Sequence, residues 1–370
     1  MAWFHFCTAN HHATGKATLA DMANWFKAGL LDLGHTVTFS NTNVEKSAIN
    51  LFWEYFEPGM AAKLHEAGIE YGIIATEIPD GTGFNWRTEA EWLDRFQGFS
   101  EAAQHARFIW TMVESTVPYY ARFCPTAFIE LGFSRRLIPA QADRVPTVDF
   151  CFFGLRTPYR EEVVERLRQY ARVEWPQHFL TAAGVSELIA NSKIGLNFKQ
   201  SPQWPIPSPT RLGRLMMAQR AVAAEYVPVA TRQGEIAGIC PETTPFHEYA
   251  LSIFEAGWKQ KADSAFAQYE AQMPMAAIME NVLDSTLPAA RVQHAPERIA
   301  LQLLPPILVS ENPLWNFVCW GETYLALKKS LGPVDVTIGL AALKTLYGSS
   351  VRHGDSLQEA QRLAALDDQE

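Results

Sequence analysis

Long apolar runs are missing from this sequence, and no window approaches the roughly 20 apolar residues that a membrane-spanning helix needs. The opening stretch Met1–Phe6 also lacks the charged segment and apolar core of a signal peptide. Charged residues make up only 19% of the chain, its formal net charge is −9, and no basic run carries interleaved aromatic residues. We therefore expect a cytoplasmic protein with no transmembrane segment and no affinity for nucleic acid.

Cysteine is scarce as well, and no Cys-x-x-Cys pair is present. The five cysteines are dispersed singly: Cys7, Cys124, Cys151, Cys240 and Cys319. An odd, scattered set predicts reduced, mostly buried thiols, with neither a disulfide framework nor a zinc site. The sequence also has no Asp-x-Asp motif. We expect no metal site.

The chain has ample material for two hydrophobic cores. It holds 370 residues, of which 48% are hydrophobic, and this length favours two domains. The first half alternates short apolar runs with helical patterns. Predicted strands are Trp3–Thr8, His35–Phe39, Ala48–Trp53, Tyr71–Thr76 and Ala106–Met112, and predicted helices cover Leu19–Leu31 and Pro58–Gly68. Such alternation is typical of βαβ units around a parallel sheet.

A polar interruption around Gln141–Pro146 ends this pattern, which then restarts. Predicted strands are Val148–Phe153, Arg172–Trp175, Ile194–Phe198 and Ala221–Ala224, with helices at Glu161–Tyr170, Gly184–Asn191 and Thr210–Gln219. A helix begins at Phe246–Tyr249, and another helical pattern, Ala262–Leu283, is broken near Met273-Pro274.

These patterns predict an α/β protein with two Rossmann-like domains that face each other across a cleft. We place the domains at residues 1–143 and 144–287, followed by a small appendix and polar tail at 288–370. In the appendix, Leu301–Val309, Trp315–Trp320 and Tyr324–Lys328 have the pattern of strands. An interaction hairpin or a homodimer contact is the simplest role for this segment.

The densest group of chemical signals follows the predicted strand Ile194–Phe198. A proline-rich loop leads to Ser208-Pro209-Thr210-Arg211, where a helix begins. Serine and threonine suit the cap of a helix, and proline suits its first turn. The free N–H groups of a helix that follows a parallel strand attract phosphate, and Arg211 adds a bidentate donor. The alternative is an ordinary capped helix with a surface arginine.

This region resembles the donor-binding half of GT-B glycosyltransferases. The likeness covers residues 146–286 well, and its second element is the opening strand Val148–Phe153, which ends in Gly154. The spore-coat CgeB-like branch and the family 4 enzymes are nearest in pattern. The resemblance implies a metal-independent transfer of a sugar from a nucleotide-sugar to a hydroxyl acceptor, as in polysaccharide biosynthesis. The nucleotide-sugar is then a substrate, so no cofactor is expected.

The family's acidic residue on the donor-binding helix is replaced here by Arg214, so retention of anomeric configuration is not implied. Glu225, just after a predicted strand, is a candidate for the donor ribose, and a solvated glutamate is the alternative. Arg156 and Lys199 each follow an apolar strand and are candidates, with Arg214, for the donor site. In GT-B enzymes such cations stabilise the leaving phosphate.

Three residues of the first domain are candidates for catalysis. His11 and His12 follow the first strand, where inverting GT-B enzymes often keep a histidine base. Glu77 follows Tyr71–Thr76, where a carboxylate base or an acceptor contact would lie, and Glu114 holds a similar position. The acceptor is left open as a glycan, a lipid-linked sugar, a protein or a small molecule. Two alternative functions share this scaffold: a nucleotide-sugar epimerase and a non-catalytic carbohydrate- or nucleotide-binding protein.

Overall fold

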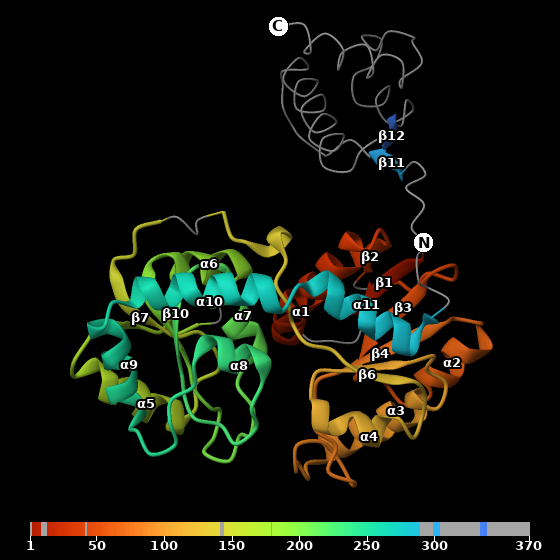
Figure 1. Cartoon of the computed structure of the whole chain (residues 1–370). Helices are drawn as coiled ribbons and strands as arrows, with labels where there is room; N and C mark the ends of the chain where they lie inside the picture. The colour runs from red at the N-terminus through yellow and green to blue at the C-terminus, as the bar shows by residue number, and fades with distance from the viewer. Residues whose placement is uncertain are drawn as a thin grey trace, which may run out of the picture. The chain divides into compact units, whose positions relative to one another are not determined.

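The computed structural model describes residues 2–8, 13–40, 43–140, 144–178 and 180–288, and the strands 299–303 and 334–338. The chain divides into two compact units, Met1–Val292 and Gln293–Glu370. The first unit holds two separate sheets, and every pairing between their strands is parallel. Figure 1 shows the two sheets with helices on their faces.

The first sheet has six strands in the order β2-β1-β3-β4-β5-β6. They are β1 (Trp3–Cys7), β2 (Thr36–Ser40), β3 (Ile49–Trp53), β4 (Tyr71–Ala75), β5 (Ile109–Thr111) and β6 (Thr126–Phe128). Its helices are α1 (Ala13–Asp32), α2 (Met60–Glu66), α3 (Ala90–Ala103) and the short α4 (Val117–Tyr120). The strand order reverses between β1 and β3, which makes the carboxyl ends of these strands the switch point where α/β sheets bind ligands.

Side chains of the central strands alternate between two buried clusters. Leu51 and Ile74 lie in the cluster that includes α1, whereas Phe52 and Ile73 lie in the cluster that includes α2 and α3. Because both faces are covered, these strands are apolar throughout, as parallel strands usually are.

The second sheet has the order β10-β9-β7-β8. Its strands are β7 (Val148–Cys151), β8 (Val173–Glu174), β9 (Ser192–Asn197) and β10 (Ala221–Ala224). The surrounding helices are α5 (Pro158–Arg168), α6 (Ala182–Ala190), α7 (Pro209–Met217), α8 (Arg232–Ala237), α9 (Phe246–Glu255) and α10 (Trp258–Gln272). Here the order reverses between β7 and β9. A Cβ at Gly195 of β9 would lie 2.0 Å from the Leu215 side chain, so the glycine lets α7 pack closely on the strand.

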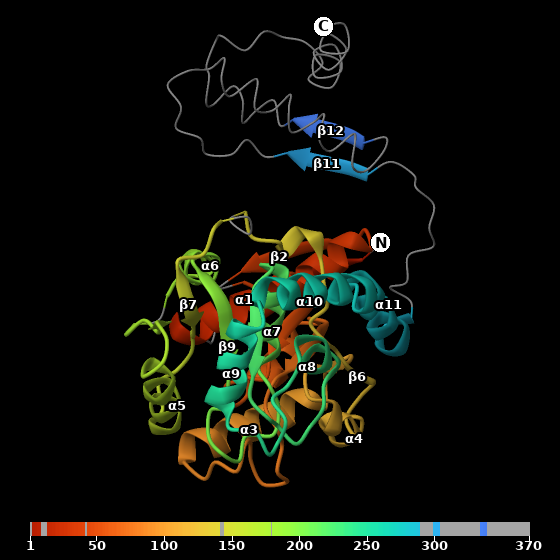
Figure 2. The same cartoon turned by 60° about the vertical axis from the view of Figure 1, so that its left-hand side comes forward.

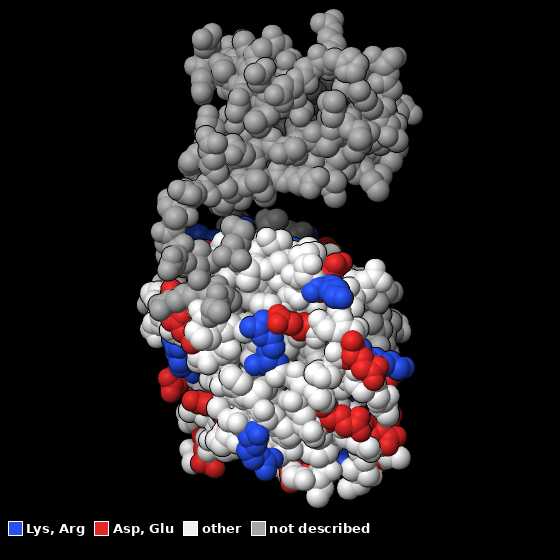
Figure 3. Space-filling view, turned by 90° about the vertical axis from the view of Figure 1, so that its right-hand side faces the viewer, with Lys and Arg blue, Asp and Glu red and all other residues white. Residues whose placement is uncertain are grey.

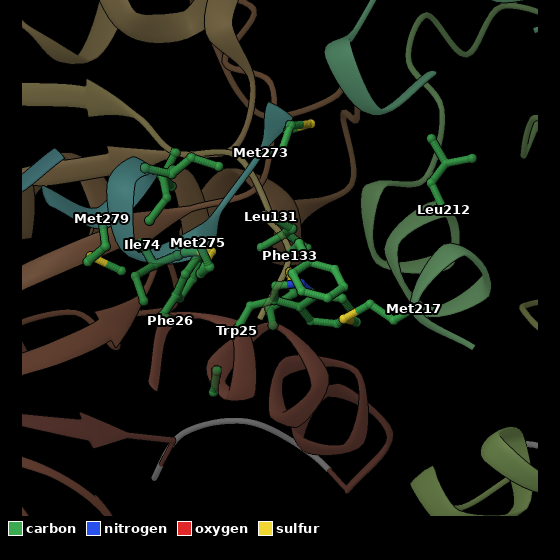
Figure 4. Close-up of a cluster of buried hydrophobic side chains, with 14 of the residues drawn as sticks. Trp25, Phe26, Ile74, Leu131, Phe133, Leu212, Met217, Met273, Met275 and Met279 are labelled. Carbon is green, nitrogen blue, oxygen red and sulfur yellow. The ribbon is translucent and has the colours of Figure 1, made fainter. Parts of the chain in front are cut away.

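The chain returns to the first sheet through α11 (Met275–Thr286), which runs on from α10 in both cartoon views (Figure 1, Figure 2). Two backbone hydrogen bonds attach the segment between α10 and α11 to Phe133. Phe133 N donates to Met273 O at 2.6 Å, and Met275 N donates to Phe133 O at 2.7 Å. Figure 4 shows Trp25, Phe133 and Met275 within the buried cluster that spans both sheets. Residues 275–286, predicted as part of the second domain, therefore pack on α1 and β6, and the domain limits stay a prediction.

The predicted α/β class with two parallel Rossmann-like sheets is confirmed, as is the helix break at Met273-Pro274. The short β6 and α8 were missed. In the second unit the described strands are β11 (Ile299–Leu303) and β12 (Val334–Ile338), which pair in parallel. The predicted strands Trp315–Trp320 and Tyr324–Lys328 lie outside the described residues.

No helix in the described part of the chain is both long and apolar enough to cross a membrane. Figure 3 shows one face of the first unit, on which Lys and Arg are interspersed with Asp and Glu and separated by uncharged surface.

Candidate active site

A cavity of about 680 Å³ opens between the two sheets of the first unit. Its wall on the side of the first sheet consists of Asp21, Met22, Thr76, Met112 and Val113. The opposite wall comes from the loops after β7, β8 and β9 and from the start of α7, and it includes Gly154, Arg156, Arg160, Trp175, His178, Ser208, Thr210, Arg211 and Arg214. The cavity thus touches the carboxyl ends of β7 and β9, where the second sheet has its switch point.

Two helices of the second sheet begin with the same short pattern. Thr157-Pro158-Tyr159-Arg160 opens α5, and Ser208-Pro209-Thr210-Arg211 opens α7. In each, the hydroxyl residue is the N-cap, proline occupies the first turn, and arginine is the third helical residue. Both arginines are about 6% exposed and line the cavity. The repeated pattern therefore delivers two buried guanidinium groups to one place.

The two caps differ in their hydrogen bonds. Thr157 accepts a bond from the N–H of Arg160 at 3.3 Å. Ser208 makes no such side-chain cap bond, which corrects the sequence-based expectation, and its hydroxyl lies 3.3 Å from that of Thr210. The first turn of α7 consequently keeps free N–H groups beside the cavity, where the positive end of the helix dipole favours an anion.

Arg211 is held from two sides by neutral groups. Its Nε donates to the carbonyl of Phe153 at 3.0 Å, and its Nη1 donates to Asn197 Oδ1 at 3.0 Å. The guanidinium lies 4.5 Å from the ring centre of Phe152. Among the described residues, no carboxylate lies within ion-pair distance of Arg211.

Burial is the main reason that the pKa of Arg211 is lowered to about 9; the neighbouring Arg160 acts in the same direction, and Cys151 opposes it. The guanidinium stays protonated at neutral pH even so. A buried positive charge without a counter-charge raises the free energy of the folded protein. An anion in the cavity would supply that counter-charge.

Two more arginines, Arg160 and Arg156, lie against aromatic rings on the same side of the cavity. Arg160 donates to the carbonyls of Lys199 and Leu155 at 3.0 and 2.9 Å, and burial lowers its pKa to about 10, opposed by Glu225. Arg156 stacks on Trp175 at 4.1 Å and donates to the carbonyl of Trp175 at 3.2 Å. Its Nε is buried without a hydrogen-bond partner. The Nη1 of the same guanidinium lies 3.4 Å from the carboxylate of Glu161.

Lys199 and Glu225, both predicted for the donor site, pair with each other instead of lining the cavity. The Lys199 ammonium lies 3.4 Å from Glu225, whose second oxygen accepts the Lys199 N–H at 2.8 Å. Glu225 also accepts from the hydroxyl of Tyr159. This pair adjoins Arg160, which donates to the carbonyl of Lys199, and its predicted contact with the donor stays a prediction.

Arg214 lines the cavity but binds the first sheet's helix α1. Its Nη1 donates to Asp21 at 2.6 Å, and its Nη2 donates to the Ala182 carbonyl at 3.0 Å and the Ser186 hydroxyl at 3.1 Å. With its donors used in this way, Arg214 connects α7 to α1 and α6.

On the side of the first sheet, Glu77 lies away from the cavity lining and within a polar network. It accepts from Arg95 at 2.9 Å and from the Asn85 amide at 2.5 Å. Arg95 also binds Glu54 at 2.9 Å. His11 and His12 lie outside the described residues.

Sequence reasoning missed three residues of this site: Arg160, Trp175 and Glu54. The repeat of the Thr/Ser-Pro-x-Arg pattern would have indicated Arg160 once Arg211 was chosen. Glu54 directly follows an apolar strand, as Glu77 does, and the same rule would have found it. No local pattern indicates that Trp175 supports Arg156.

No family model matches the sequence, and no curated protein matches it either. Among solved structures, a glycosyltransferase involved in avilamycin A biosynthesis, AviGT4, is 13% identical with a TM-score of 0.47, covering 77% of this chain and 97% of that one. A mutant of the T4 phage enzyme BGT, in complex with UDP-glucose, is 10% identical with a TM-score of 0.46, covering 78% and 100%. A UDP-glucosyltransferase from Polygonum tinctorium is 7% identical with a TM-score of 0.37, covering 77% and 98%.

The geometry itself supports binding of a polyanion. Arg211, Arg160 and the start of α7 converge on one side of the cavity, and Trp175 and Phe152 give the guanidinium groups a rigid apolar support. Donors fixed in this way need little reorganisation to stabilise negative charge. Within the described residues, no cluster of three or more His, Cys, Asp or Glu side chains is placed to hold a metal ion.

Gly154 offers a test of this arrangement. Its φ is +147°, and a Cβ there would lie 2.8 Å from Nη2 of Arg211. We predict that Gly154→Ala weakens binding of a nucleoside diphosphate by about tenfold or more, because the methyl group displaces a charged donor worth on the order of 1.5–3 kcal/mol. Calorimetric titration measures the affinity. Gly257→Ala is the control: its φ of +94° also strains an alanine and lowers stability, but the added Cβ meets no atom within 4 Å, so the affinity should stay unchanged. Equal affinities for Gly154→Ala and the parent protein would contradict the placement of the site.

Proposed function

We propose that this protein is a glycosyltransferase of the GT-B type that takes a nucleotide-sugar as donor and a hydroxyl group as acceptor. The observation that carries the proposal is Arg211, a charged side chain buried in a cavity with no carboxylate partner among the described residues. A diphosphate is the counter-ion that fits a helix start flanked by two arginines. The sequence resemblance over residues 146–286 adds the sugar and the reaction type.

In this reaction the bond between the anomeric carbon and the diphosphate oxygen breaks, and a bond from the acceptor oxygen forms. The electron pair of the broken bond goes to the diphosphate, whose negative charge increases in the transition state. Arg211, Arg160 and the N–H groups of α7 stabilise that charge. Ser208 and Thr210 supply hydroxyl donors beside them, and Arg156 supplies a further guanidinium.

The acceptor side is assigned to the first sheet, which provides the opposite wall of the cavity. His11, His12 and Glu77 stay the sequence-based candidates for catalysis there. The CgeB-like or family 4 subtype, the cytoplasmic location and a homodimer through residues 288–370 also stay predictions, as does the nature of the acceptor.

The role of Arg211 can be measured with a panel of UDP, GDP, ADP, dTDP and CMP. We expect one of these ligands to raise the melting temperature of the parent protein, because a ligand that binds only the folded state stabilises it. Arg211→Ala should weaken that ligand about tenfold to hundredfold, through loss of a charge-assisted contact of roughly 1.5–3 kcal/mol. Arg211→Lys should not restore the affinity fully, since a point charge cannot replace the planar fork.

The exposed Arg166, paired with Glu162 on α5, provides a matched control. Arg166→Ala should leave nucleotide affinity unchanged. If Arg211→Ala folds and binds nucleotide as tightly as the parent protein, the donor site lies elsewhere.

Chelation tests the second feature of the proposal. Because cationic side chains supply the charge stabilisation, nucleotide release from the donor should continue in EDTA at the untreated rate. Loss of turnover in EDTA, with recovery on addition of Mg²⁺ or Mn²⁺, would show that a metal ion and not the arginine group stabilises the leaving diphosphate.

A further inference from the structure

A buried carboxylate, that of Glu54, lies at the switch point of the first sheet. Glu54 directly follows β3, and its residue is 1% exposed. Charged residues are seldom fully buried without a partner. Such a group next to the carboxyl ends of parallel strands lies where α/β sheets place their chemistry.

Thr76 connects Glu54 to the cavity. Both groups of Thr76 donate to the carboxylate: the N–H to Oε2 at 2.6 Å and the hydroxyl to Oε1 at 2.6 Å. Thr76 itself lines the cavity, on the wall opposite the arginines. A hydroxyl has one donor and two acceptor lone pairs. Because Glu54 takes the donor of Thr76, its lone pairs are left to accept a proton from a molecule in the cavity.

The charges around Glu54 keep it a usable base at neutral pH. Burial raises the pKa of Glu54 to about 7, and the charge of Glu77 adds to this, whereas Arg95 and the two bonds from Thr76 oppose it. Arg95 comes from α3 and is shared by both carboxylates. Tyr120 of α4 also faces the network and donates to the carbonyl of Glu77. Arg95 can balance the negative charge of only one of the two carboxylates, so the other carboxylate favours binding a proton.

Other carboxylates are worse placed. Asp21 also lines the cavity, but Arg214 holds it in an ion pair at 2.6 Å. Glu77 has both oxygens occupied, by Arg95 and Asn85, and does not line the cavity. Among the described residues, the hydrogen-bonded route from the first sheet's cavity wall to a buried carboxylate runs through Thr76.

We propose that Thr76 and Glu54 form a proton relay that removes the proton from the acceptor hydroxyl. This rests on the proposed glycosyl transfer. As the acceptor oxygen bonds to the anomeric carbon, its proton passes to Thr76 Oγ1, and the original Thr76 proton passes to Glu54 Oε1. The electron pair of the broken glycosidic bond leaves with the diphosphate. Glu54 later returns the proton to solvent by the same route. Arg95 is a positioning residue that holds the Glu54 carboxylate.

The relay is tested with the nucleotide that raises the melting temperature most, offered as its glucose, galactose and mannose conjugates, with water and methyl glycosides as acceptors. Release of the nucleoside diphosphate is followed against pH. Wild-type turnover should rise as pH passes through about 7, because only ionised Glu54 accepts the proton. Glu54→Gln should lower kcat about 10²- to 10⁴-fold, with nucleotide affinity intact and the pH dependence lost.

The variants of Thr76 separate a relay from a structural role. Thr76→Val should lose as much turnover as Glu54→Gln, and the double variant should be no worse than either alone, since the two residues act as a unit. Thr76→Ser keeps the hydroxyl and should restore most of the activity. Glu70, exposed and paired with Arg107 just before β4, provides the matched control, and Glu70→Gln should behave as wild type. Near-UV circular dichroism checks that each variant folds.

A second measurement needs no substrate. Infrared difference spectra between about pH 5 and pH 8 should show the carbonyl band of a buried protonated carboxyl that is absent in Glu54→Gln and shifts in Thr76→Val. Absence of that band, or a wild-type kcat in Glu54→Gln, overturns the relay. The proposed function still stands in that case if the wild-type protein binds a nucleotide. Loss of turnover in Asp21→Asn but not in Glu54→Gln overturns the relay also. Failure of every nucleotide to bind the wild-type protein overturns the proposed function and the relay together.

Discussion

The uncompensated charge of Arg211 is the constraint on which the proposed chemistry depends. Folding costs free energy when a cation is buried beside a second cation, Arg160, and meets only a carbonyl and an amide oxygen. The ring of Phe152, itself stacked on Phe198 at 4.1 Å, supports the guanidinium without neutralising it. Such a site is costly when empty and stabilised when an anion binds.

The rest of the first unit aligns two switch points around this charge. In the first sheet the strand order reverses between β1 and β3. In the second sheet it reverses between β7 and β9. The cavity takes one wall from each sheet, so an anion held by Arg211 faces Thr76 and the buried Glu54 across it. The return of α11 to α1, and the bond of 2.6 Å from Arg214 to Asp21, link the two halves that carry these groups.

Much of this arrangement could be predicted from local sequence. Apolar runs alternating with helical periodicity indicated the parallel sheets, and the predicted helix start at Thr210 lies one residue after the first residue of α7, Pro209. The burial of Arg211 could not be predicted in this way, because it bonds to Phe153, 58 residues away in the chain. The same limit applies to Glu54, whose partner Arg95 is 41 residues away on α3. Helical periodicity located α11 but did not indicate that it packs on the first sheet, since an apolar face fits either core.

The most direct test of the central claim is a crystal structure of the protein with the nucleoside diphosphate that binds it most tightly. We expect phosphate oxygens within hydrogen-bond distance of Arg211 and of the first N–H groups of α7, with Arg160 and Arg156 alongside. A diphosphate bound elsewhere, with Arg211 still directed only at Phe153 and Asn197, would contradict it.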